Sequence, residues 1–189
     1  MSIKITNFAH GTTVDNEQHI SSGWKDAELS ELGVEQGKKL RELVKDRKFD
    51  VVFCSDTKRA LETAQIAFEG QAPIITDARL RECNYGELNG GPSSVVEPMQ
   101  ENNFSRKFPG GESYDDVKTR IADFLKFLKA NYDGKSVALV SHKAPQLALD
   151  VLLKNKTWEQ ALAEDWRKTP PTPRLRRTGW QPGWEYILE

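Results

Sequence analysis

The sequence predicts an α/β fold, a three-layer sandwich whose mostly parallel central sheet has helices on both faces. Short apolar runs alternate with segments of helical periodicity along the chain. Polar residues able to do chemistry follow three of these runs directly, as is typical of the carboxyl edge of an open parallel sheet. Helices on both faces are what such alternation requires, because a parallel sheet must be covered on each side.

Each element is predicted from a local pattern. The helix expected over 30–47 would bury Leu32, Leu40, Leu43 and Val44, and Ser113 caps the helix that ends before Gly134. The stretch 86–111 has no clear period and is expected to be a loop-rich excursion over the sheet edge. The expected strands are 3–8, 51–54, 73–75, 136–140 and 184–188, and the other expected helices are 58–68, 144–153 and one starting at Thr157.

Length and composition fit one domain over residues 1–189, with 167–182 as an extended or mobile tail. The net charge is −1, from 27 basic and 28 acidic residues, so nothing pulls the chain toward nucleic acid or an anionic membrane. The two cysteines form neither a disulfide framework nor a zinc motif. The sequence therefore favours a cytoplasmic protein without a membrane partner, and the oligomeric state, a homodimer included, stays open.

Two of the three histidines fall one residue beyond a predicted strand. His10 follows the first strand, His142 follows the strand 136–140, and Arg59 lies just after the strand 51–54. A neutral imidazole is a usable nucleophile near pH 7, and a guanidinium matches two phosphate oxygens. Gly11 would let the backbone approach the anion closely. This pattern indicates phosphoryl transfer through a covalent intermediate.

Six segments in register resemble the histidine phosphatase superfamily, which includes phosphoglycerate mutases. The match covers residues 3–150, most of the chain. The segments are AHGTTVDN (9–16), SGWKDAELSELGVEQ (22–36), SDTKRALETAQ (55–65), LRECNYGELNG (80–90), PGGESYDDVKTR (109–120) and VALVSH (137–142).

The resemblance implies a role for each matching position. His10 would be the phosphorylated nucleophile, Arg59 and His142 would bind the phosphoryl group, and Glu82 would protonate the leaving group and then activate water. The remaining implied contacts to phosphate or substrate are Asn16, Ser22, Gly23 and Tyr85.

Ala9 departs from the family pattern, which has an arginine before the nucleophile. A charged, bidentate phosphate contact is thereby lost. Either the site is weakened, or another cation compensates; we lean toward compensation because the other catalytic positions are intact. The candidate cations are Lys143 and the tail residues Arg174, Arg176 and Arg177.

The favoured function is metal-independent hydrolysis of a small phosphorylated metabolite, with no cofactor and with phosphate or another anion in the pocket. A phosphoglycerate mutase is the nearest alternative. Only residues 91–108 separate the acid segment from PGGES, where those mutases carry a long charged insertion, so phosphatase is favoured. A phospho-ligand binding domain with impaired catalysis is the other alternative, supported by Ala9 and opposed by His10 with Glu82.

Several of these residues also have a purely structural interpretation. Glu82 could be a loop carboxylate paired with Arg79 or Arg81, and Arg59 could pair with Glu62 on a helix surface. His19 is expected to be solvated, Cys83 to be a packing residue, and Trp184 to pack the C-terminal segment.

Overall fold

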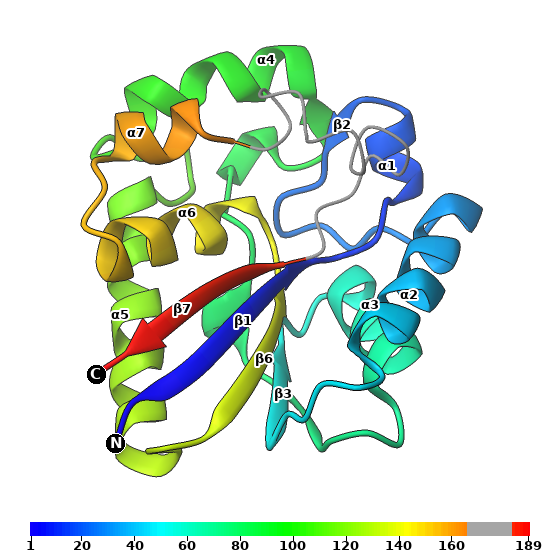
Figure 1. The fold of residues 1–189 in the computed structure, drawn as a ribbon. Helices are drawn as coiled ribbons and strands as arrows, with labels where there is room; N and C mark the ends of the chain where they lie inside the picture. Colours follow the sequence, from blue (N-terminus) through cyan, green and yellow to red (C-terminus); the bar gives the residue numbers. More distant parts are fainter. Residues whose placement is uncertain (166–182) are drawn as a thin grey trace.

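The computed structural model describes residues 1–165 and 183–189, and the predicted three-layer α/β architecture is confirmed in it (Figure 1). The central sheet has the strand order β4-β3-β6-β1-β7. Neighbouring strands are parallel except β7, which runs antiparallel to β1 at one edge. The strands are β1 (Ile3–Ala9), β3 (Val51–Cys54), β4 (Ile74–Thr76), β6 (Ser136–Ser141) and β7 (Trp184–Leu188).

The helices divide between the two faces of this sheet. Helices α2 and α3 pack on one face, and α5, α6 and α7 pack on the other. Their bounds are α2 (Glu31–Val44), α3 (Lys58–Phe68), α5 (Tyr114–Asn131), α6 (Lys143–Leu153) and α7 (Trp158–Ala163).

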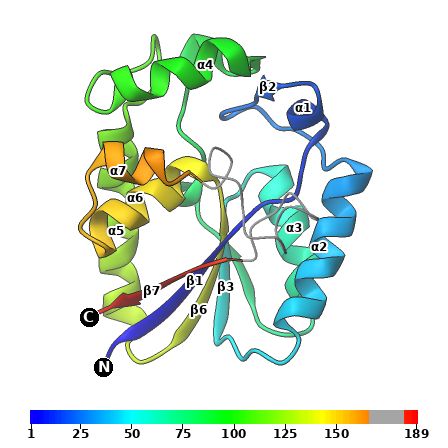
Figure 2. The same cartoon turned by 45° about the horizontal axis from the view of Figure 1, so that its top comes forward.

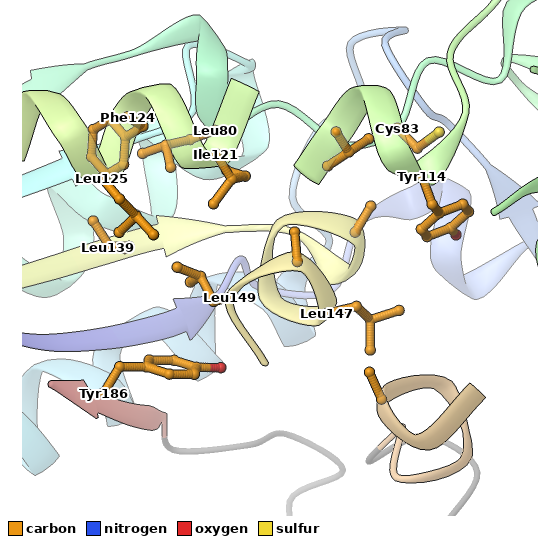
Figure 3. Packing of buried hydrophobic residues seen from close by; sticks show 14 of the residues in the cluster. Leu80, Cys83, Tyr114, Ile121, Phe124, Leu125, Leu139, Leu147, Leu149 and Tyr186 are labelled. Atoms are coloured by element: carbon orange, nitrogen blue, oxygen red, sulfur yellow. The ribbon is translucent and has the colours of Figure 1, made fainter. Parts of the chain in front are cut away.

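The larger core lies under α5 and α6 (Figure 3). Leu139 of β6 points into it between Ile121 of α5 and Leu149 of α6, and Tyr186 of β7 closes one side. These side chains are 4% exposed or less. Burying each aliphatic side chain contributes roughly 1.5–3 kcal/mol, which fixes the helices that carry pocket residues at their ends.

Helix α2 begins after Ser30, whose hydroxyl accepts from the Gly33 amide. Leu40 and Val44 are buried as predicted, but Leu32 and Leu43 are 48% and 46% exposed. The prediction for these two leucines is wrong because they lie about a quarter turn around the helix from the stripe that faces the sheet.

The stretch 86–111 is not only loop, which corrects the prediction for it. It contains β5 (Gly91–Pro92), α4 (Ser93–Met99) and the 3-10 helix η3 (Gln100–Asn103). Helix α4 is too short to show a period, and Pro98 lies inside it. Burial of Val96 holds it against the main core, a tertiary effect that the local sequence does not reveal.

Three short elements lie beyond the carboxyl ends of β1 and β6 and form the roof of the molecule (Figures 1 and 2). They are α4, α1 (Val14–Glu17) and β2 (Ile20–Ser21), and β2 pairs with β5. Further 3-10 turns occupy Ala78–Leu80 and Gly86–Leu88. The last predicted strand, 184–188, is confirmed as β7, while the predicted tail 167–182 lies outside the described residues. Among the described residues no helix is both long and apolar enough to cross a bilayer.

Candidate active site

The two histidines at the strand ends are brought side by side by the sheet. Strands β1 and β6 pair in parallel with Ala9 opposite Ser141, and the amide of His10 donates to the Ser141 carbonyl at 3.1 Å. The imidazole rings of His10 and His142 have their centroids 4.9 Å apart. The prediction that both lie at one sheet edge therefore agrees with the geometry.

A pocket of about 330 Å³ opens at this edge. Every substrate or catalytic residue predicted from the sequence lines it except Gly11. The lining includes His10, Asn16, Ser22, Gly23, Arg59, Glu82, Tyr85, His142 and Lys143, and Ala9 borders it too.

The tautomer of His10 is set by its neighbour. The Nδ1 atom of His10 lies 2.7 Å from the carbonyl oxygen of Gly11. A carbonyl only accepts hydrogen bonds, so Nδ1 must carry the proton. In the neutral ring the lone pair then falls on Nε2, the nitrogen available as a nucleophile.

Gly11 has a different role from the one expected. A Cβ at Gly11 would lie 2.6 Å from the carbonyl oxygen of Gly33, in the first turn of α2. Its amide donates to Thr63 Oγ1 at 2.9 Å. The glycine is therefore required for close packing of the β1–α1 connection on α2. Its contribution to catalysis is indirect, through the carbonyl oxygen that accepts a hydrogen bond from His10 Nδ1.

Arg59 lies in the first turn of α3 with 2% exposure. Its guanidinium donates to the carbonyl oxygens of Gly23, at 2.7 Å, and Lys25, at 2.9 Å. The alternative pairing with Glu62 is not present, so the guanidinium is fixed by backbone. Burial lowers the pKa of Arg59, but arginine stays charged in proteins.

His142 is the N-cap residue of α6 and is 2% exposed. Its Nε2 lies 3.3 Å from Oγ1 of Thr57, the N-cap residue of α3. Burial, with the nearby charges of Arg59 and His10, holds the pKa of His142 well below its usual value. His142 is therefore a neutral imidazole near pH 7.

Glu82 is directed into the pocket by two backbone amides. Its Oε1 accepts from the amide of Cys83 at 2.8 Å and from that of Ala144, in the first turn of α6, at 3.0 Å. The alternative pairing with Arg79 or Arg81 is wrong, because those guanidinium groups bind Asp77 and Asp56. The second carboxylate oxygen remains for a proton transfer.

Asn16 and Ser22 line the pocket from the β1–β2 connection. Asn16 Oδ1 accepts from the Thr13 amide at 3.0 Å in a capping box. The Nδ2 donor of Asn16 therefore points away from the Thr13 amide. The Ser22 hydroxyl donates to Asp15 at 2.7 Å.

The two remaining predicted contacts enter the pocket by different means. Gly23 has φ of +56°, a conformation suited to glycine, and its carbonyl holds Arg59. Tyr85 packs edge-on against Phe108 with its ring buried.

Lys143 lines the pocket, but its ammonium group binds two other side chains. Its Nζ lies 2.5 Å from Asp165 Oδ2 and 2.9 Å from Gln100 Oε1, and the side chains of Lys143 and Asp165 are 6% and 2% exposed. To compensate for Ala9, Lys143 would have to leave a buried ion pair. The tail residues proposed for the same task, Arg174, Arg176 and Arg177, lie outside the described residues.

The sequence analysis did not identify four further residues of the pocket lining, Glu97, Gln100, Gln146 and Trp184. Trp184 was expected to serve packing alone. His19 was expected to be merely solvated; it is exposed but lines the rim, with an unusual φ of +55° for a non-glycine residue. Nothing in the local sequence around Glu97, Gln100 or Gln146 indicates that these helical residues line a pocket.

A parallel sheet with two histidines, an arginine and a carboxylate at its carboxyl edge defines a histidine phosphatase-type protein. A model of the histidine phosphatase superfamily (branch 1) matches residues 8–173. This chain belongs to that superfamily, as the six sequence segments predicted.

Its relatives include both mutases and phosphatases. It is 34% identical over 151 residues to phosphoglycerate mutase-like protein 4 of Arabidopsis thaliana, covering 74% of this chain and 66% of that protein. It is 30% identical over 178 residues to the 2,3-bisphosphoglycerate-dependent phosphoglycerate mutase of Rhizobium meliloti (strain 1021), covering 86% and 84%. Among solved structures, a mycobacterial glucosyl-3-phosphoglycerate phosphatase with VO3 superposes with a TM-score of 0.77 and 27% identity, covering 85% of this chain and 86% of that one.

Proposed function

We propose that this protein hydrolyses a phosphomonoester through a phosphohistidine formed on Nε2 of His10. The observation that carries the proposal is the His10 side chain, whose Nδ1 is bound to the Gly11 carbonyl and whose ring lies 4.9 Å from that of His142. A nucleophile with a fixed tautomer beside a second imidazole is suited to covalent catalysis.

The first step forms the bond from Nε2 to phosphorus and breaks the bond from phosphorus to the leaving oxygen. Glu82, protonated at the oxygen not bound by the Cys83 and Ala144 amides, gives its proton to that leaving oxygen. In the second step the Glu82 carboxylate takes a proton from water, the water oxygen attacks phosphorus, and the bond to Nε2 breaks. Inorganic phosphate is released and Glu82 is protonated again.

Positive charge in the pocket supports the transferring phosphoryl group. The buried guanidinium of Arg59 is held rigidly by two carbonyls, so little reorganisation is needed when the phosphate arrives. His142 adds a donor, and the phosphate dianion would favour its protonation. The α6 N-terminus directs its dipole to the same place. We propose that these groups make the reaction metal-independent; among the described residues no cluster of histidine, cysteine and acid side chains is fit to hold a metal.

Hydrolysis is favoured over mutase activity by the outer part of the pocket. A mutase must hold a phosphorylated acid in place of water, and the lysine that lines this part is bound to Asp165. Helix α4 of the roof adds the carboxylate of Glu97 to the described part of the lining. A binding role without catalysis is disfavoured because a mere phosphate binder needs neither His10 nor Glu82.

The test replaces His10 with Asn and measures hydrolysis of 4-nitrophenyl phosphate in EDTA. We expect activity to fall at least about a thousand-fold, as for other covalent nucleophiles. The matched control is His19→Asn, since Asn tolerates the positive φ at that position. Phosphorylation of the protein by the substrate should be acid-labile and alkali-stable, as for phosphohistidine. Its presence in the wild type and the control, and its absence from His10→Asn, would locate the phosphoryl group on His10.

Full activity of a folded His10→Asn protein would contradict the mechanism. Activity that vanishes in EDTA and returns with magnesium would contradict the metal-independent reaction.

A further inference from the structure

Four residues of the pocket lining have a chemistry of their own. They are Glu97 of α4, Gln100 of η3, Gln146 of α6 and Trp184 of β7, and we call them the outer wall. None of these residues belongs to the segments through which the chain resembles its family.

Gln146 is fixed in orientation by a buried carboxylate one helical turn away. Its Nε2 donates to Asp150 Oδ2 at 3.1 Å, and the two residues are 5% and 3% exposed. A carboxylate accepts but does not donate, so the amide nitrogen must face Asp150. The amide oxygen Oε1 is therefore the atom that Gln146 presents to the pocket.

Asp150 is itself held in place, so this orientation is rigid. Its Oδ1 accepts from the Tyr186 hydroxyl at 2.9 Å, and its Oδ2 accepts from Lys156 at 3.1 Å. Lys154 lies 3.2 Å from Oδ1. Turning the Gln146 amide over would set two oxygens against each other in a buried place, which is costly.

The charged side chains of the pocket lining also favour a substrate that donates hydrogen bonds to the outer wall. In the pocket lining provided by residues 1–165 and 183–189, the lysine and arginine side chains are Lys143 and Arg59. Arg59 serves the phosphate end, and Lys143 is bound to Asp165 and Gln100. Glu97 adds an exposed carboxylate. Among these described residues, a second anionic group on the substrate would face acceptors and an acid.

We infer that the substrate is a phosphorylated sugar or polyol, neutral apart from its phosphate, whose hydroxyl donates to Gln146 Oε1. Glu97 offers a second acceptor, and Trp184 supplies an apolar surface for carbon-bound hydrogens. The inference rests on the proposed phosphatase function. It makes Gln146 a specificity-determining residue and Asp150 the positioning residue behind it.

The experiment compares three substrates of the wild-type enzyme, sorbitol 6-phosphate, n-hexyl phosphate and 3-phosphoglycerate, with 4-nitrophenyl phosphate as a reference. A site built to bind a hydroxyl discriminates strongly against analogues that lack it, so we expect kcat/KM for sorbitol 6-phosphate to exceed both others by about ten-fold or more.

The variant Gln146→Met keeps the length of the side chain and removes the acceptor. We expect it to lower kcat/KM for sorbitol 6-phosphate by about ten-fold or more and that for n-hexyl phosphate by less than about three-fold. The matched control is Gln65→Met, the same change at an exposed position of α3 outside this pocket.

A wild type that prefers 3-phosphoglycerate or n-hexyl phosphate to sorbitol 6-phosphate would overturn the inference, whether or not the variant folds. So would equal losses on both substrates in a folded Gln146→Met. Failure of the proposed function is distinct, because the wild type would then not hydrolyse 4-nitrophenyl phosphate either.

Discussion

Two sets of pocket residues, which we call the inner and outer ends, are held by different kinds of contact. At the inner end, His10, Arg59 and Glu82 are each fixed by backbone groups, namely the Gly11 carbonyl, the Gly23 and Lys25 carbonyls, and two amides. At the outer end, Gln146 and Lys143 are fixed by other side chains, Asp150 and Asp165. Backbone-held groups are placed by the fold itself, whereas side-chain networks can change without changing the fold.

This contrast suggests a division of labour. Backbone contacts preorganise the inner end for a phosphoryl group that every substrate shares. The outer end touches the part of the substrate that varies, and its networks set which donors and acceptors face the pocket. Variants at the inner end should therefore act on all substrates, and variants at the outer end on some.

The largest effect is expected from Glu82→Gln on a substrate with a poor leaving group. General acid catalysis contributes roughly 10²–10⁴-fold, so turnover of an alkyl phosphate should fall by that order. 4-Nitrophenyl phosphate needs little protonation, and its rate should fall much less. The measurement is kcat on both substrates.

Glu87→Gln is the matched control, because it makes the same change at an exposed position outside the pocket. It should leave the ratio of the two rates, alkyl phosphate to 4-nitrophenyl phosphate, near that of the wild type. Equal losses on both substrates in Glu82→Gln would assign Glu82 to structure instead of proton transfer.

A smaller effect is expected from restoring the arginine before the nucleophile. Since Lys143 is bound to Asp165, the inner end lacks a cation among the described residues that could replace the missing guanidinium. Ala9→Arg should tighten binding of inorganic vanadate or phosphate by about ten-fold or more, because one charged hydrogen bond contributes about 1.5–3 kcal/mol. Isothermal titration measures this affinity.

Ala9→Met fills similar space without charge and should bring no gain. If Ala9→Arg also changes nothing, the compensation that the sequence favours must come from outside the described residues, where Arg174, Arg176 and Arg177 belong. A double variant, Lys143→Met with Asp165→Asn, should leave phosphate affinity nearly unchanged.

The smallest effect concerns pH and His142. Its folded-state pKa is lowered, mainly by burial, so below about pH 6.5 the unfolded chain binds a proton that the folded chain does not. The free energy of unfolding should therefore fall with decreasing pH by up to about 1.4 kcal/mol per pH unit from this group. His142→Gln should remove that contribution, so the fall below pH 6.5 should be less steep in urea titrations.

Unchanged urea m-values in both proteins would show that they unfold to similar states. Identical pH slopes for wild type and His142→Gln would contradict the assignment of a buried neutral imidazole.

The sequence by itself determined the fold class and the inner end of the pocket. His10, Arg59 and His142 each follow a strand closely, and parallel strands must bring their carboxyl ends to one edge. Local pattern also identified the β7 strand and the cap at Ser113, because an alternating run and an oxygen-bearing residue before a helix are local features.

Only the tertiary structure decided the outer end. Gln146 donates to Asp150 one turn along the same helix, and that carboxylate is held by Tyr186 of β7 and by Lys156. Lys143 forms its ion pair with Asp165, which lies 22 residues further along the chain. The spacing of Gln146 and Asp150 is local, but no local spacing brings Tyr186 to Asp150 or Asp165 to Lys143, because those contacts join residues far apart in the chain.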